Sequence, residues 1–272
     1  ALIFPVTTCN YRDFRPVLNT IYALFKGKRL YEQGNYDEEI LWFSDINLET
    51  ISHAKIQRQS VDYNKSGFYS LRHDDGHLMI IIQDFKTRPA QMDQMHIDLW
   101  HKGVNVLCDS GTYSYASDLG RKMALTAAHN TVKVVGKEQM KKHGPFLIYN
   151  WTRSKDVVFS DNYFKGTMIS KNGYSHIRSI NKNTDGYTII DQLVGDCKNY
   201  KILFHTPCVV KKNENGLDLF LNNKIVTKII TDEEIQINDC YRSLFYLEKE
   251  EISQISVGNK TNSNTKVKVV LK

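Results

Sequence analysis

The hydrophobic pattern of the chain changes near residue 50. In the first part, apolar residues recur at spacings of three and four, at Phe14, Val17, Leu18, Ile21, Leu24 and Phe25. This period predicts an amphipathic helix that Gly27 ends. A second short helix is expected over 36–46, with Ile40, Leu41 and Phe43 along one side. Two helices are too few to close a core, so we expect them to pack on the following domain or on a segment outside this chain.

From about residue 55 the pattern becomes short β runs separated by turn residues. Asp185-Gly186 and Asn215-Gly216 are hairpin signals because these residues accept positive φ. The sequence therefore predicts a mainly β fold, a large antiparallel multi-stranded β-sandwich with a short N-terminal helical segment. We place the two domains at 1–50 and 51–272. Strands are expected at 67–72, 78–84, 95–101, 104–108, 131–135, 176–180, 187–193, 201–205, 217–221, 244–247 and 267–271.

Charge and composition narrow the choice of partner. A formal charge of +6 and a pI near 8.9 favour anionic ligands. Acidic and basic residues are interspersed, and no nucleic-acid motif appears, so we expect acidic polysaccharide and no nucleic acid. No apolar run approaches the ~20 residues of a membrane helix, so no membrane span is expected. Five cysteines without CxxC spacing indicate buried thiols instead of a disulfide framework.

Candidate chemistry concentrates in two segments, 109–115 and 126–131. They combine a carboxylate at the end of a strand, a glycine turn, two tyrosines and a histidine beside an asparagine. Asp109 alone is explained by a turn carboxylate that binds its own backbone. His129 lies near the polar residues Asn130 and Thr126. We therefore favour a functional role for the pair of Asp109 and His129.

Further candidates each have an ordinary structural alternative. Tyr113 and Tyr115 alternate on a segment expected to be extended, so both can face a sugar, although aromatic packing explains them equally well. His96 can lie in a cleft or be a satisfied sheet histidine. The loop 136–144 carries three lysines and a histidine that would attract an anionic glycan. Groups that can bind carboxylate or sulfate, or else form ordinary salt bridges, are Arg88, Arg121, His176 and Arg178.

A longer run of motifs resembles the heparinase II/III-like family of polysaccharide lyases. The likeness preserves order over most of 60–210, and 10–46 looks like the last helices of the family's α/α toroid. The motifs are Met95 to Tyr115, Arg121, Thr126 to Val132, Gly136, Glu138-Gln139, Ser175 to Arg178, Asp191 and Phe204-His-Thr-Pro207.

The resemblance implies β-elimination of polysaccharides that contain uronic acid, in a cleft between toroid and sandwich. A lyase must neutralise the uronate carboxylate, remove the C5 proton and protonate the leaving oxygen. In the family an Asn, a His and a Tyr of the toroid do part of this work, and most of the toroid is absent from this chain. The expected partners are therefore an acidic polysaccharide and the missing N-terminal toroid. The family also implies a bacterial protein of the periplasm or exterior.

Site residues follow from these candidates. We predict catalytic roles for His96, Tyr113, Tyr115 and His129, and substrate-binding roles for Arg88, Arg121, Asn130, His176 and Arg178. The family's sandwich often holds one divalent metal, zinc or calcium, which here implies Asp109, His129 and Gln91 as ligands. An HxHxD-like motif of the family falls on 89–93, so Pro89 and Gln91 replace its two imidazoles. An amide oxygen is a poorer zinc ligand than an imidazole.

Two other functions compete with lyase activity. Loss of the two imidazoles is compatible with a non-catalytic module that binds a polysaccharide or serves exopolysaccharide synthesis. A hydrolase or epimerase would instead need a close pair of carboxylates with separable roles, and none stands out. We therefore predict a polysaccharide lyase when the chain is joined to its toroid, with the binding module as the alternative.

Overall fold

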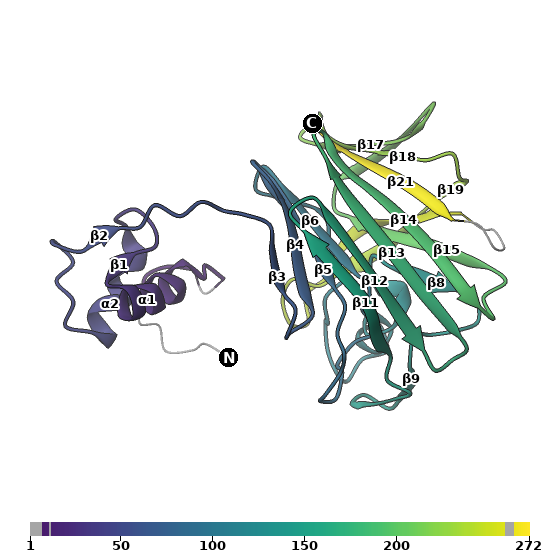
Figure 1. Ribbon diagram of the computed structural model, residues 1–272, viewed down its shortest axis with the longest axis horizontal. Helices are drawn as coiled ribbons and strands as arrows, with labels where there is room; N and C mark the ends of the chain where they lie inside the picture. The colour runs from purple at the N-terminus through teal and green to yellow at the C-terminus, as the bar shows by residue number, and fades with distance from the viewer. Residues whose placement is uncertain (1–6, 11, 259–263) are drawn as a thin grey trace. The chain divides into compact units, whose positions relative to one another are not determined.

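The computed structural model describes residues 7–10, 12–258 and 264–272, which form two compact units, Ala1–Arg58 and Gln59–Lys272 (Figure 1). Residues 1–6 and 11, part of the expected helical segment, lie outside the described residues. In the first unit, helices α1 (Arg15–Lys26) and α2 (Glu38–Phe43) follow one another, with a 3-10 turn, η1 (Asn35–Asp37), before α2. The short strands β1 (Lys28–Arg29) and β2 (Ser52–His53) pair in parallel.

Helix α1 confirms the predicted period but buries the opposite face within its unit. Gly27 ends it in the left-handed conformation, at φ 64°. Its buried side chains are Pro16, Asn19, Thr20 and Ala23, and Asn19 donates to Asp37, which also binds Arg29. Residues 7–58 therefore leave the apolar stripe of α1 uncovered, and they hold together partly through buried polar contacts.

The second unit is almost entirely antiparallel β-structure, which confirms the predicted sandwich. Its first strands are β3 (Val61–Tyr63), β4 (Phe68–His73), β5 (Gly76–Ile81), β6 (Ile97–His101), β7 (Val104–Leu107), β8 (Val132–Val134), β9 (Lys141–His143) and β10 (Leu147–Tyr149). They continue with β11 (Arg153–Ser160), β12 (Tyr163–Ser170), β13 (Tyr174–Asn183), β14 (Gly186–Gly195), β15 (Tyr200–Thr206), β16 (Val209–Asn213) and β17 (Gly216–Leu221). The last are β18 (Lys224–Ile230), β19 (Ile235–Arg242), β20 (Glu250–Val257) and β21 (Thr265–Leu271). Two short helical segments, α3 (Asp118–Met123) and η2 (Thr126–Ala128), interrupt them.

Three sheets share one core. The largest has eight strands in the order β11-β12-β13-β14-β21-β18-β17-β16, and its long strands run side by side in Figure 1. A five-stranded sheet, β3 to β7, and a four-stranded sheet, β19-β20-β15-β8, lie against it. Tyr69 of β4 packs 5.2 Å from Phe164 of β12 between ring centroids, and the Tyr187 hydroxyl of β14 donates to the Leu71 carbonyl of β4. Alternating side chains from both layers thus form the apolar interior of a sandwich.

Most predicted strands are confirmed with shifted ends, but one is wrong. Residues 244–247 form a turn in which Leu247 adopts a φ of 63°. The Leu247 N–H donates to the Tyr113 carbonyl instead of to a neighbouring strand. Most of the apolar side chains here are exposed on the turn instead of pairing in a sheet. None of the helices in the described part of the chain is long and apolar enough to cross a membrane.

Candidate functional site

The turn after β7 holds Asp109 in a fixed orientation. One carboxylate oxygen, Oδ1, accepts the N–H of Gly111 at 2.6 Å. Gly111 has a φ of 77°, and a Cβ there would lie 2.2 Å from the carbonyl oxygen of Ser243. Only glycine fits this close approach. Asp109 is therefore the turn carboxylate that its position predicts, and its second oxygen, Oδ2, remains available.

That second oxygen pairs with His129, which follows η2. The distance from Oδ2 to Nδ1 is 2.6 Å, with the imidazole fully buried and the carboxylate 32% exposed. Burial opposes ionisation of Asp109, but the charge and hydrogen bond of His129 outweigh it and hold the carboxyl pKa well below its ordinary value. Burial likewise opposes a charged His129, yet Asp109 raises the pKa of that imidazole. The two groups form an ion pair at neutral pH.

The other nitrogen of His129 lacks a partner. Nε2 is buried and has no hydrogen bond within the described residues. A buried polar atom without a partner is costly and rare in native proteins, and it often marks a site that a ligand or ion completes. Because Asp109 fixes Nδ1, it also fixes the direction in which Nε2 points.

His96 lies beside this pair on the approach to β6. Its Nδ1 is 3.7 Å from Asp109 Oδ2, and its ring stands nearly perpendicular to that of His129 at 5.8 Å. Burial lowers the pKa of His96 to about 3, despite the raising effect of Asp109. Nδ1 accepts the backbone N–H of Asn130, so this neutral imidazole carries its hydrogen on Nε2.

Three side chains with metal-binding atoms lie close together. His96, Asp109 and His129 each offer a ligand atom, and these atoms lie within 4.8 Å of one another. Imidazole and carboxylate are common ligands of divalent metals. The contact with Nδ1 places the Asp109 carboxylate across the His129 ring from the partnerless Nε2, so joint binding of one ion requires this contact to open. The side-chain amide of the predicted ligand Gln91 donates to the Thr112 hydroxyl. The cluster thus contains a second imidazole, that of His96, which the resemblance did not imply as a metal ligand.

Asn130 ties this cluster to the neighbouring strands. Its side-chain amide donates to the carbonyls of Ile97 and Cys108, and its Oδ1 accepts the N–H and Nδ1–H of His205. All these groups are buried, so Asn130 has no free donor for a substrate. The expected substrate-binding role of Asn130 is therefore corrected to a positioning role between His96 and His129.

His205 should make the protein sensitive to acid. Burial lowers the pKa of His205 to about 4, so the unfolded chain binds this proton more readily than the folded one. Its contribution is complete above about pH 6.5 and is lost as the pH falls towards about 4, at about 1.4 kcal/mol per pH unit. We expect His205→Gln to reduce the stability loss between about pH 7 and about pH 5 by about 2 kcal/mol in urea unfolding. The exposed His143→Gln should leave that loss unchanged, and equal losses for both variants would contradict the assignment.

Arg178 and Asp191 form a buried network beneath the cluster. Arg178 on β13 and Asp191 on β14 are wholly buried, and the guanidinium pairs with both carboxylate oxygens. Its Nη1 also donates to the carbonyls of Met95 and Asn130, the neighbours of His96 and His129. The Nε2–H of His176 donates to Asp191 Oδ1 at 2.6 Å. The expected binding of substrate by Arg178 and His176 is therefore corrected, because both lie in the core, where Arg178 holds backbone carbonyls and His176 contacts Asp191.

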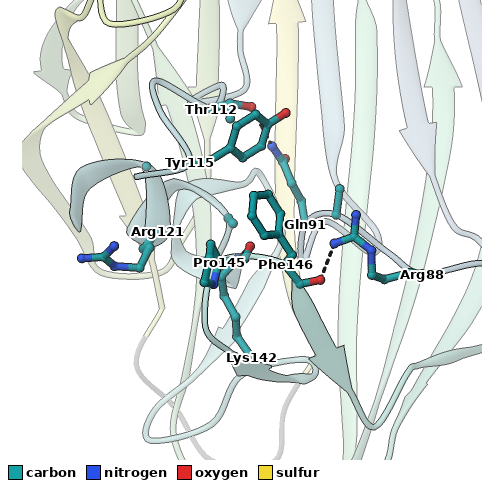
Figure 2. A pocket seen from close by; sticks show the side chains of 11 residues that line it. Arg88, Gln91, Thr112, Tyr115, Arg121, Lys142, Pro145 and Phe146 are labelled. Atoms are coloured by element: carbon teal, nitrogen blue, oxygen red, sulfur yellow. Dashed lines mark hydrogen bonds between the residues drawn. The ribbon is translucent and has the colours of Figure 1, made fainter. Parts of the chain in front are cut away.

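A pocket opens beside Thr112, which belongs to the same turn as Asp109 (Figure 2). Gln91 and Thr112 border it, and the ring of Tyr115 lies 5.6 Å from that of Phe146. Arg88 also lines it, and Lys142 joins from the predicted basic loop. Figure 2 shows the guanidinium of Arg121 turned outward, where it pairs with Asp118.

The two tyrosines do not share a face. Tyr113 has a φ of 60°, so the segment is not extended and the expected alternation with Tyr115 is wrong. Tyr115 is 60% exposed at the pocket. Tyr113 is half-buried, and its carbonyl binds the turn at Leu247. Of the two, only Tyr115 lines the pocket.

Comparisons with known proteins agree on the fold. A family model described as Heparinase II/III-like, C-terminal, matches residues 55–269. Heparan sulfate lyase HepC from Pedobacter heparinus is 17% identical with a TM-score of 0.69, over 95% of this chain and 41% of that protein. A heparinase III is 15% identical with a TM-score of 0.67, over 94% and 40%. The chain spans less than half of these solved proteins, and no curated protein sequence matches it.

Proposed function

Because the chain belongs to the heparinase II/III-like family, we propose that it forms the β-sandwich part of a lyase that cleaves uronic-acid-containing polysaccharide by β-elimination. The observation that carries this proposal is the pair of Asp109 and His129, 2.6 Å apart, with His129 Nε2 lacking a partner. A carboxylate that orients an imidazole in this way leaves one ring nitrogen to exchange a proton or to bind a cation.

In this proposal the sandwich supplies part of the chemistry. His96, Asp109 and His129 would hold a divalent metal, which when bound would neutralise the substrate carboxylate. Without a metal, the ion pair keeps His129 protonated and able to donate a hydrogen bond from Nε2. Tyr115 stands exposed at the neighbouring pocket, where its hydroxyl can reach a sugar.

The remaining groups would come from an upstream toroid. We propose that α1 and α2 are its last helices, because residues 7–58 leave the apolar stripe of α1 uncovered. Such a stripe needs a partner to be stable in water. The toroid would then contribute the Asn, His and Tyr that this family uses for proton transfer.

The test is the ultraviolet absorbance of unsaturated uronate product. The protein in full length and the present chain are each incubated with heparan, alginate, hyaluronan and bacterial exopolysaccharides. A rise with the full-length protein alone supports β-elimination and a contribution of the toroid. No rise in absorbance with any substrate, together with measurable binding, would support the alternative of a non-catalytic module.

That alternative rests on a specific observation. Pro89 and Gln91 stand where the family has imidazoles, and Gln91 is engaged with Thr112. A site that lost these groups could retain polysaccharide binding through the pocket of Figure 2. Turnover by the full-length protein would exclude it.

Metal removal tests the proposed donor set directly. A chain freed of metal by a chelator should regain thermal stability when Zn²⁺ or Ca²⁺ is added. An ion at 100 times its Kd stabilises the folded state by about 2.7 kcal/mol. His129→Ala should abolish this gain in differential scanning fluorimetry, whereas the exposed His143→Ala should preserve it. The proposed site is wrong if neither ion raises the melting temperature of the unaltered chain.

A further inference from the structure

The pocket of Figure 2 carries positive charge without an opposing carboxylate. Its volume is about 150 Å³, roughly ten times the space that one water molecule needs. Arg88 and Lys142 line it from two different segments, and none of its eleven lining residues is acidic. A cavity of this size and sign suits an anionic group larger than water.

The two cations have no salt-bridge partner in the described part of the chain. Arg88 donates to the Phe146 carbonyl and Lys142 to the Pro145 carbonyl, which orients both groups but neutralises neither. Burial, and then the charge of Arg88, lower the pKa of Lys142. Two like charges held together repel each other, so a bound oxyanion would remove a repulsion as well as form new hydrogen bonds.

An exposed aromatic pair borders these charges. The rings of Tyr115 and Phe146 lie 5.6 Å apart, and they are 60% and 52% exposed. The two rings offer apolar faces that suit the CH-rich face of a sugar ring, and Tyr115 adds a hydroxyl. Gln91 and Thr112 add amide and hydroxyl groups at the same pocket.

We propose that Arg88 and Lys142 bind a sulfate or carboxylate substituent of an acidic sugar whose ring lies against Tyr115 and Phe146. The inference rests on the proposed function only for the identity of the ligand as an acidic polysaccharide. The pocket adjoins the proposed centre, because Thr112 belongs to the turn that carries Asp109. The bound sugar would therefore be a neighbour of the residue that is cleaved. Arg121 is not part of this subsite, since it faces outward and is paired with Asp118.

Binding to defined oligosaccharides tests this subsite. Isothermal titration of the present chain would use three probes: a heparin oligosaccharide, the same with its sulfates removed, and the same with its carboxylates reduced. We expect the double variant R88A/K142A to bind the heparin oligosaccharide at least about ten-fold more weakly than the unaltered chain, because charge-assisted hydrogen bonds are lost. K165A/K224A removes the same charge from exposed strand positions outside the pocket and should change affinity less than about two-fold.

The probes also identify the substituent. If the double variant loses affinity for the desulfated probe, the pocket takes a carboxylate; if it loses affinity for the carboxyl-reduced probe, the pocket takes a sulfate. R88K/K142R keeps both charges and should retain most of the affinity, which separates a lost ligand contact from a disturbed loop. Equal affinity of R88A/K142A and the unaltered chain for all three probes would overturn the subsite.

Binding and turnover distinguish the two proposals. A full-length protein that cleaves nothing, with a chain that still loses binding in R88A/K142A, would refute the lyase and keep the subsite. A full-length protein that cleaves its substrate, with a chain whose affinity is unchanged in R88A/K142A, would refute the subsite and keep the lyase.

Discussion

Asp109→Asn and His129→Ala should each lower kcat of the full-length protein on its acidic polysaccharide by about 10² to 10⁴-fold. His129→Ala removes the imidazole, and Asp109→Asn removes the negative charge that holds it across the 2.6 Å contact. Proton transfer by a positioned side chain contributes about this factor. Steady-state kinetics on the best substrate of the panel would measure the loss. The two losses should not multiply in the double variant, because the two groups act as one unit.

A matched change controls for general damage. Asp118→Asn removes the same charge at an exposed position of the same unit and should leave kcat unchanged. If the pair is purely structural, its variants would instead lower the melting temperature and keep their turnover. Unchanged turnover in Asp109→Asn would contradict a catalytic role for the pair of Asp109 and His129.

Arg178→Met should lower the free energy of unfolding by about 3–5 kcal/mol. Removal of the guanidinium leaves the fully buried Asp191 carboxylate without its main countercharge and frees the carbonyls of Met95 and Asn130. Denaturant unfolding followed by circular dichroism measures the change. The exposed Arg153→Met breaks a surface pair with Asp84 and should cost about 1 kcal/mol or less.

A second change can show where the cost arises. When Asp191→Leu is added to Arg178→Met, the buried charge disappears and part of the stability should return. If Arg178→Met costs no more than Arg153→Met, the network does not hold the backbone beside His96 and His129. That result would remove the physical reason for treating Arg178 as a positioning residue.

The fold was predictable where one face of an element is regularly apolar. Helix α1 and strand β14 follow their periods, whereas strand β15 is buried almost throughout. Strand β11 was not predicted, because its buried and exposed side chains alternate weakly and its register shifts between Lys155 and Val158. The false strand at 244–247 has apolar residues without a sheet partner, a fact that only tertiary contacts reveal.

The site was predictable where turn chemistry constrains a residue. A strand-end aspartate before a glycine turn indicated Asp109, and the family motif suggested His129 as its companion. Burial was not predictable: Arg178 and His176 carry charge or polarity that suggests a surface, yet both lie in the core because Asp191 compensates them. His205 appeared only within a quoted motif, and its contact with Asn130 joins residues 75 positions apart.

The most direct test of the proposed reaction is cleavage by the full-length protein in water enriched in heavy oxygen. Elimination breaks the bond between the glycosidic oxygen and C4 without adding water, whereas hydrolysis places a solvent oxygen in the product. The proposal predicts products that end in an unsaturated uronate and carry no heavy oxygen by mass spectrometry. Incorporation of heavy oxygen into saturated products would contradict it.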